Sequence, residues 1–155
     1  MKKQSKIRLA IVLLLALVWP AIGQDTKLLV NIDDSGVAIQ GYDPVGFFTN
    51  NRPVKGDAKY VLKSNGATYF FASQEHRDVF ALNPEKYEPA FGGYCAYGVS
   101  KGKLAKIDVS DFEIVNGKLL LQHNGFARDN FDKDPKENLA KADANWATLV
   151  EKNGK

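Results

Sequence analysis

The stretch that decides the fold is residues 58–71, AKYVLKSNGATYFF, in which two strand-forming segments flank Asn65 and Gly66. An Asn-Gly pair readily takes the positive φ angles of a two-residue type I′ turn, so this stretch predicts a β-hairpin. Residues 112–122, FEIVNGKLLLQ, have the same arrangement around Asn116 and Gly117. We therefore expect two antiparallel strand pairs.

One helix is predicted after each hairpin. Asp134 can cap a helix that begins at Pro135, and apolar residues then follow at helical spacing until Gly154, with Trp146 the largest of them. A second helix should begin at Ser73 and end before a proline. His76 lies on the apolar face of this helix. The pattern predicts an α+β fold, a small antiparallel sheet built from hairpins with helices packed on it.

The N-terminus predicts a secretory signal peptide over residues 1–23. A basic segment, MKKQSKIR, precedes eleven apolar residues (9–19) and then the small residues Ala21 and Gly23. A membrane-spanning helix needs roughly 20 apolar residues, so we expect cleavage before Gln24 and no permanent membrane anchor. The mature chain, residues 24–155, is predicted to be one domain without internal repeats, periplasmic or secreted.

The charge balance argues against a nucleic-acid partner. Four of the 21 Lys and Arg residues lie in the predicted signal, which leaves 17 basic residues against 18 acidic ones in the mature chain. Such a domain has no basic surface to attract phosphate groups. The sequence also contains no signature of a nucleotide, flavin or haem site.

Several motifs in a fixed order resemble the YHS domain family. They read GYDPV (41–45), YFFAS (69–73), RDVF (77–80) and NPEKY (83–87), and GGYCAY (92–97) and ADANW (142–146) continue the similarity to the longer, exported members. The resemblance covers a core of about 39–150. In short metal-associated members, three thiolates stand at the positions that Gly46, Ala72 and His76 occupy here, so the resemblance implies a metal role but not three-thiolate binding.

Cys95, His76 and His123 form the candidate metal-ligand set, because they are the only cysteine and histidines in the chain. Two imidazoles and a thiolate suit copper or zinc if the fold brings them together. Cys95 precedes a short predicted helix, where a thiolate is favoured. The alternative is that Cys95 is a small buried residue packed among aromatic side chains.

Three further residues are candidates for a ligand pocket. Asp43 precedes a proline and can close an Asx turn or contribute directly to a site. Tyr94 belongs to an aromatic set that suits a core or the lining of a pocket. Asn124 follows the last predicted strand and can fix a loop or cap the next helix.

These residues leave three functions open. The first is a non-enzymatic module that binds a copper or zinc ion. The second is a small-ligand or protein-interaction domain in which Cys95 is structural, with no protein partner indicated. The third, thiol catalysis, has the least support, because no motif supplies an oxyanion hole or an acid beside the thiol.

Overall fold

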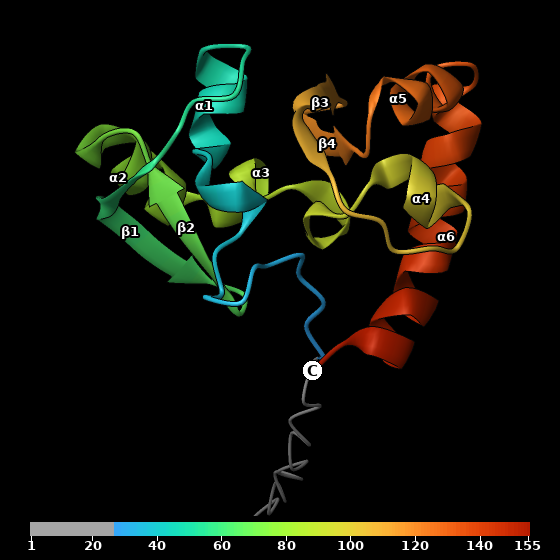
Figure 1. The fold of residues 1–155 in the computed structure, drawn as a ribbon, viewed down its shortest axis with the longest axis horizontal. Coiled ribbons are helices and arrows are strands. Elements are labelled where there is room, and N and C mark those ends of the chain that lie inside the picture. The colour runs from blue at the N-terminus through green and yellow to red at the C-terminus, as the bar shows by residue number, and fades with distance from the viewer. Residues whose placement is uncertain (1–26) are drawn as a thin grey trace, which may run out of the picture.

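The computed structural model describes residues 27–155, so the predicted signal peptide and its cleavage site lie outside the described residues. Figure 1 shows the helices and two short hairpins in two groups. None of the helices within residues 27–155 has the length and apolarity needed to cross a membrane. The elements are η1 (Ile39–Gly41), α1 (Pro44–Thr49), β1 (Asp57–Ser64), β2 (Ala67–Phe71), α2 (Gln74–Leu82), α3 (Pro84–Tyr87), η2 (Ala90–Gly93), α4 (Ala96–Ser100), β3 (Asp108–Val115), β4 (Lys118–Gln122), α5 (Gly125–Phe131) and α6 (Pro135–Asn153).

Both predicted hairpins are present, and the α+β class is confirmed. β1 pairs with β2 and β3 with β4, each pair antiparallel, and they form two separate two-stranded sheets rather than one. The turns have the expected positive φ angles, 45° and 79° at Asn65 and Gly66 and 51° and 76° at Asn116 and Gly117. In each hairpin the register shifts at the start of the first strand.

The chain contains an internal repeat, contrary to the expectation from the sequence. Residues 37–87 (the first repeat) and 89–138 (the second repeat) have the same order of elements: a left-handed turn, a short helix, a hairpin, a second helix and the beginning of a third. Equivalent residues of the two repeats (counterparts) are 52 positions apart before the hairpins and 51 positions apart from the start of the hairpins onward. The two groups of elements in Figure 1 correspond to these repeats, with α6 added to the second.

Backbone angles show the repeat most directly. Ile39, Gln40 and Gly41 have φ angles of 51°, 53° and 76°, and the counterparts in η2 have 54°, 57° and 77°. Left-handed angles are rare for a β-branched residue such as Ile39. The same three-residue turn thus occurs twice, and each time its first residue is not glycine but Ile39 or Phe91.

Helix caps and isolated bridges also coincide. The residue before each proline-initiated helix has nearly the same φ and ψ, −154° and 75° at Asn83 against −152° and 78° at Asp134. A parallel bridge joins Val37 to Thr68, and its counterpart joins Pro89 to Leu119. The identical residues are Ala38/Ala90, Gly41/Gly93, Tyr42/Tyr94, Gly46/Gly98, Asp57/Asp108, Asn65/Asn116, Gly66/Gly117, Arg77/Arg128, Asp78/Asp129, Phe80/Phe131 and Pro84/Pro135.

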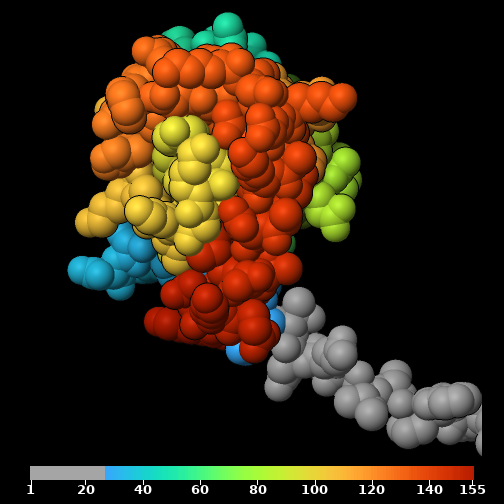
Figure 2. Space-filling model, turned by 90° about the vertical axis from the view of Figure 1, so that its right-hand side faces the viewer, coloured from blue at the N-terminus to red at the C-terminus, as the bar shows by residue number. Residues whose placement is uncertain are grey.

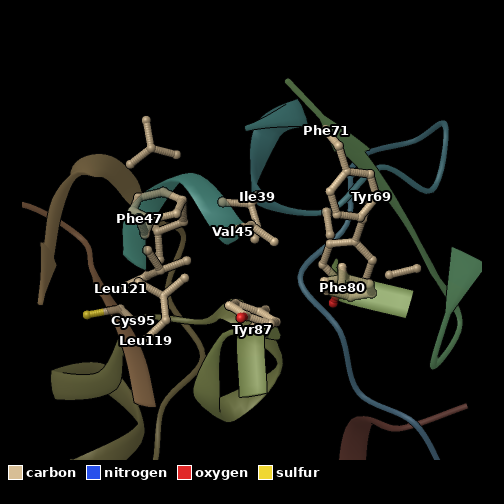
Figure 3. Packing of buried hydrophobic residues seen from close by; sticks show 14 of the residues in the cluster. Ile39, Val45, Phe47, Tyr69, Phe71, Phe80, Tyr87, Cys95, Leu119 and Leu121 are labelled. Carbon is tan, nitrogen blue, oxygen red and sulfur yellow. The ribbon is translucent and has the colours of Figure 1, made fainter. Parts of the chain in front are cut away.

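The two repeats share a buried core. The larger buried cluster contains Phe71 and Phe80 from the first repeat and Leu119 and Leu121 from the second. Figure 3 shows these side chains around Tyr87, at the end of the first repeat. Direct aromatic contact also crosses between repeats, because the ring centroids of Phe47 and Phe112 lie 4.9 Å apart.

Helix α6 begins and ends where the sequence predicts. The Asp134 side chain accepts from Glu137 N, and Gly154 follows the last turn. The helix covers α4, and Figure 2 shows both beside α5 on one face of the molecule. Ala142 and Leu149 are buried in a second cluster, and Trp146 is half-buried against it, with its ring centroid 5.9 Å from that of Phe91.

Trp146→Ala is expected to lower the free energy of unfolding by about 2 kcal/mol, less than the full cost of removing a buried tryptophan. The reason is that the ring packs edge-on against Phe91 but is only partly buried. Denaturant unfolding measures the change. A value below about 0.5 kcal/mol would show that α6 contributes little to the common core.

Candidate functional site

Asp43 is a fully buried carboxylate that joins three segments of the first repeat. Its side chain has 0% exposure. Oδ1 accepts from Val45 N at 2.9 Å and Gly46 N at 3.3 Å, which caps helix α1 as the predicted Asx turn. Oδ2 accepts from Ala72 N at 2.8 Å and so ties α1 to the end of β2.

The fourth partner of Asp43 is His76. Ser73 caps α2 by accepting from His76 N, and this fixes the imidazole in the first turn of the helix. His76 Nδ1–H donates to Asp43 Oδ2 at 2.6 Å, and the imidazole is 21% exposed. A carboxylate in this position sets the orientation and tautomer of the ring, so the lone pair of Nε2 is the group left for a ligand.

Cys95 is the counterpart of Asp43 in the second repeat. It caps α4 as Asp43 caps α1: Gly98 N donates to the sulfur at 3.4 Å. The counterpart of His76 is Ala127, so the second repeat contains the capping residue without the imidazole. The Cys95 side chain is 2% exposed, as a packed structural residue would be.

A buried glutamine completes the surroundings of Cys95. Gln122 Oε1 accepts from Cys95 Sγ at 3.4 Å and from Tyr97 N at 3.0 Å, and Nε2 donates to Glu113 Oε1 at 3.2 Å. Burial of Glu113 raises the pKa of its carboxyl group, although the hydrogen bond from Gln122 opposes this shift. The hydrogen bonds of the thiol are therefore those of a side chain that holds α4 on β4.

The other predicted site residues lie in separate places. His123 is exposed, and its Nδ1–H donates to Lys106 O at 2.9 Å. Asn124 caps α5 by accepting from Ala127 N at 3.0 Å, one of the two roles expected for it. Tyr94 lines an open cavity of about 370 Å³ beside the segment 28–30, and partial burial raises the pKa of its phenol.

The candidate metal ligands are not assembled into one group. Within residues 27–155, no three His, Cys, Asp or Glu side chains are placed to hold a metal ion. Figure 3 places Cys95 beside Leu119 and Leu121, at the opposite end of the cluster from Phe80, which belongs to the helix that carries His76.

Sequence reasoning missed two features of this site. It placed Asp43 in the motif GYDPV and His76 on a helix 33 residues later, and the fold pairs them. It also missed the repeat, for which signals exist: Gly-Tyr-x-x-x-Gly at 41–46 and 93–98, and Arg-Asp-x-Phe at 77–80 and 128–131. Aligning these motifs would have matched Cys95 with Asp43 and so separated the thiol from His76.

Comparison with known proteins gives no further assignment. No protein-family model, no curated protein and no solved structure matches the chain.

Proposed function

We propose that the chain is an exported, YHS-like binding module whose recognition group is Nε2 of His76, with copper or zinc as its ligand. The observation that supports this proposal is the 2.6 Å hydrogen bond from His76 Nδ1–H to the buried carboxylate of Asp43. Histidines that bind metal ions usually donate their second ring N–H to such a carboxylate or to a carbonyl, and the interaction strengthens the imidazole as a ligand.

The proposed site supplies one imidazole, which suits exchange better than storage. Copper and zinc both accept imidazole nitrogen, and a closed structural zinc site needs four protein ligands. With His76 as the single donor at this position, the remaining coordination positions belong to solvent or to the molecule that delivers the ion. Binding of this kind is weak and reversible, as a module that passes an ion on requires.

A second candidate function is a small-ligand or protein-interaction domain with a structural cysteine. The structural role that it gives to Cys95 agrees with the contacts of this residue, whose sulfur caps α4 by accepting from Gly98 N and donates to Gln122 in the core. Under both candidates Cys95 is not a metal ligand. The two therefore differ in what His76 binds.

His76→Gln is expected to weaken binding of Zn(II) and Cu(I) at least tenfold, within the 10- to 100-fold range of changes beside metal sites. Glutamine can still donate to Asp43 but lacks the imidazole nitrogen. Cys95→Ser, which preserves the cap, should leave the affinity unchanged. Calorimetric titration at pH 7.5 measures both variants.

Two outcomes would contradict the metal proposal. Equal affinities in wild type and His76→Gln would place the ion elsewhere and leave the interaction domain as the better candidate. A loss in Cys95→Ser as large as that in His76→Gln would make the thiol a ligand, against the role its contacts indicate. Thermal unfolding of each variant separates loss of a ligand from loss of the fold.

A further inference from the structure

A cavity of about 420 Å³ lies where the segment around η1 meets the second repeat. Residues from the segment 31–40 line one side, and residues 106–107, just before β3, line the other. Gln40 Nε2 donates to Ile107 O at 3.0 Å and so joins the two sides. The volume falls within the roughly 300 to 1,000 Å³ of pockets that hold small organic ligands. Neither His76 nor Asp43 lines this cavity, so it is separate from the proposed metal site.

Charged side chains of both signs line the cavity without pairing with one another. Asp33, Asp34 and Lys106 belong to its lining, and all three residues are exposed. None of them takes part in an ion pair among residues 27–155. The two carboxylates and the ammonium group are therefore too far apart to form an ion pair. Each of these groups is accessible to an opposite charge on a ligand.

The carboxylates keep oxygen atoms free for a donor. Asp33 Oδ1 accepts from Ser35 Oγ at 2.6 Å and from Ser35 N and Val37 N, both at 2.9 Å. The hydrogen bond from the Ser35 hydroxyl, followed by that from Val37 N, lowers the pKa of Asp33, so its carboxyl group is ionised at neutral pH. These three bonds use one oxygen of Asp33, and the Asp34 carboxylate has no hydrogen-bond partner in the described part of the chain.

The first repeat contains a counterpart of Lys106. The backbone N–H groups of the two capping residues donate to equivalent carbonyl groups, those of Val54 and Ala105, at 2.8 and 3.1 Å. Lys55 and Lys106 directly follow these two residues. The two lysines are therefore equivalent, and their contacts can be compared.

Lys55 has a structural contact that Lys106 does not have. Lys55 Nζ donates to Gln40 O at 2.7 Å, in the left-handed turn of the first repeat. In the second repeat the equivalent carbonyl, Gly92 O, accepts from Asn31 N at 2.8 Å instead. Lys106 Nζ has no hydrogen-bond partner within residues 27–155 and lines the cavity. Its ammonium group is thus available to a ligand.

We infer that this cavity binds a free α-amino acid with an aliphatic side chain, its carboxylate held by Lys106 Nζ and its ammonium group by the Asp34 carboxylate. Hydrogen bonds between oppositely charged groups are stronger than those between neutral groups. Asp33 adds negative charge that attracts the ammonium group. Aliphatic side chains, among them Ile32 and Ile107, also line the cavity and offer contacts to the side chain of the amino acid.

Ligands with a single charge suit this cavity less well. An anion attracted by Lys106 is repelled by the two carboxylates, and a cation attracted by Asp33 and Asp34 is repelled by the lysine. A zwitterion meets an opposite charge at each of its ends. The combination of separated charges and aliphatic lining therefore favours an amino acid over an inorganic ion.

The test is an NMR titration of the isotope-labelled full chain with L-leucine and with two analogues that each lack one of its charges. The analogue 3-methylbutylamine lacks the carboxylate, and 4-methylpentanoic acid lacks the ammonium group. We expect L-leucine to shift the amide signals of residues 31–34 and 106–107 saturably. It should bind about three- to fivefold more tightly than either analogue, the effect of one ion pair at an exposed site.

Each charge on the protein should affect one analogue only. Lys106→Gln should weaken binding of L-leucine and of 4-methylpentanoic acid by about three- to fivefold, but not that of 3-methylbutylamine. Asp34→Asn should weaken binding of L-leucine and of 3-methylbutylamine by a similar factor, but not that of the acid. Lys103→Gln and Asp129→Asn remove the same charges from exposed residues outside the cavity, so they are matched controls and should change none of the three affinities.

Three results would overturn the inference. If L-leucine binds no more tightly than one of its analogues, the cavity does not recognise both charges. An affinity for L-leucine that is unchanged in Lys106→Gln or in Asp34→Asn would remove that residue from the site. The absence of saturable shifts, or shifts outside residues 31–40 and 106–107, would show that the cavity takes no amino acid. Thermal unfolding of both variants should match the wild type, because the two side chains are exposed and form no ion pair within residues 27–155.

Discussion

Asp43→Ala is expected to lower the free energy of unfolding by about 3 to 5 kcal/mol, because each buried donor left without its acceptor costs about 1 to 3 kcal/mol. The carboxylate accepts four hydrogen bonds, from Val45 N, Gly46 N, Ala72 N and His76 Nδ1. Alanine would leave three buried backbone N–H groups and the imidazole without this acceptor. Denaturant unfolding followed by circular dichroism measures the change.

The repeat supplies a matched control for this substitution. Cys95 occupies the equivalent capping position but accepts from Gly98 N alone. Cys95→Ala should therefore cost about 1 kcal/mol, as the loss of a single helix cap does. If both substitutions cost the same, Asp43 acts as a cap only, and the hydrogen bonds to Ala72 and His76 contribute nothing measurable.

Gly92→Ala is expected to cost about 3 to 5 kcal/mol, from backbone strain and overpacking together. A Cβ atom at this position would lie 2.1 Å from the carbonyl oxygen of Leu29, and its φ is 57°. The clash is with backbone, so no side-chain rotation can relieve it. Faster amide exchange at Asn31, whose N–H donates to Gly92 O at 2.8 Å, should show displacement of the N-terminal segment.

Gly117→Ala separates the two contributions. Gly117 also has a positive φ, 76°, but a Cβ there would meet nothing within 4 Å. It should cost about 1 to 2 kcal/mol, the strain alone. The counterpart of Gly92 is Gln40, which keeps φ at 53° with a full side chain. If Gly92→Ala costs no more than Gly117→Ala, the approach of Leu29 is not what requires glycine.

Local signals in the sequence predicted the elements whose causes are themselves local. The Asn-Gly turns, the Ser73 and Asp134 caps and the apolar stripe of α6 each depend on residues within a few positions of one another. The separation into two sheets was not predictable in this way, because the pairing of strands is decided by long-range packing. The turn at Ile39 is a stronger case, since local preference opposes its left-handed backbone and burial in the common core maintains it.

The candidate site shows the same limit. The helix-face argument correctly placed His76 toward the protein interior, but periodicity within one helix cannot identify the group that it meets. Asp43 was interpreted as a turn residue, and its second oxygen proved to bind across the fold. Cys95 drew attention because it is the single cysteine, whereas its role follows from a position that the repeat shares with an aspartate.

The two ends of the described chain are joined by hydrogen bonds. Leu28 N donates to Lys155 O and Lys155 N donates to Leu28 O, both at 2.9 Å, and the ion pair between Lys27 and Glu151 lies beside them. The backbone therefore traces an almost closed ring. Such proteins tolerate circular permutation when the new ends fall in an exposed turn, and residues 50–52 form one. Opening the ring there divides the first repeat in the sequence, and the contacts between the two repeats stay the same, because they do not depend on where the ring is opened.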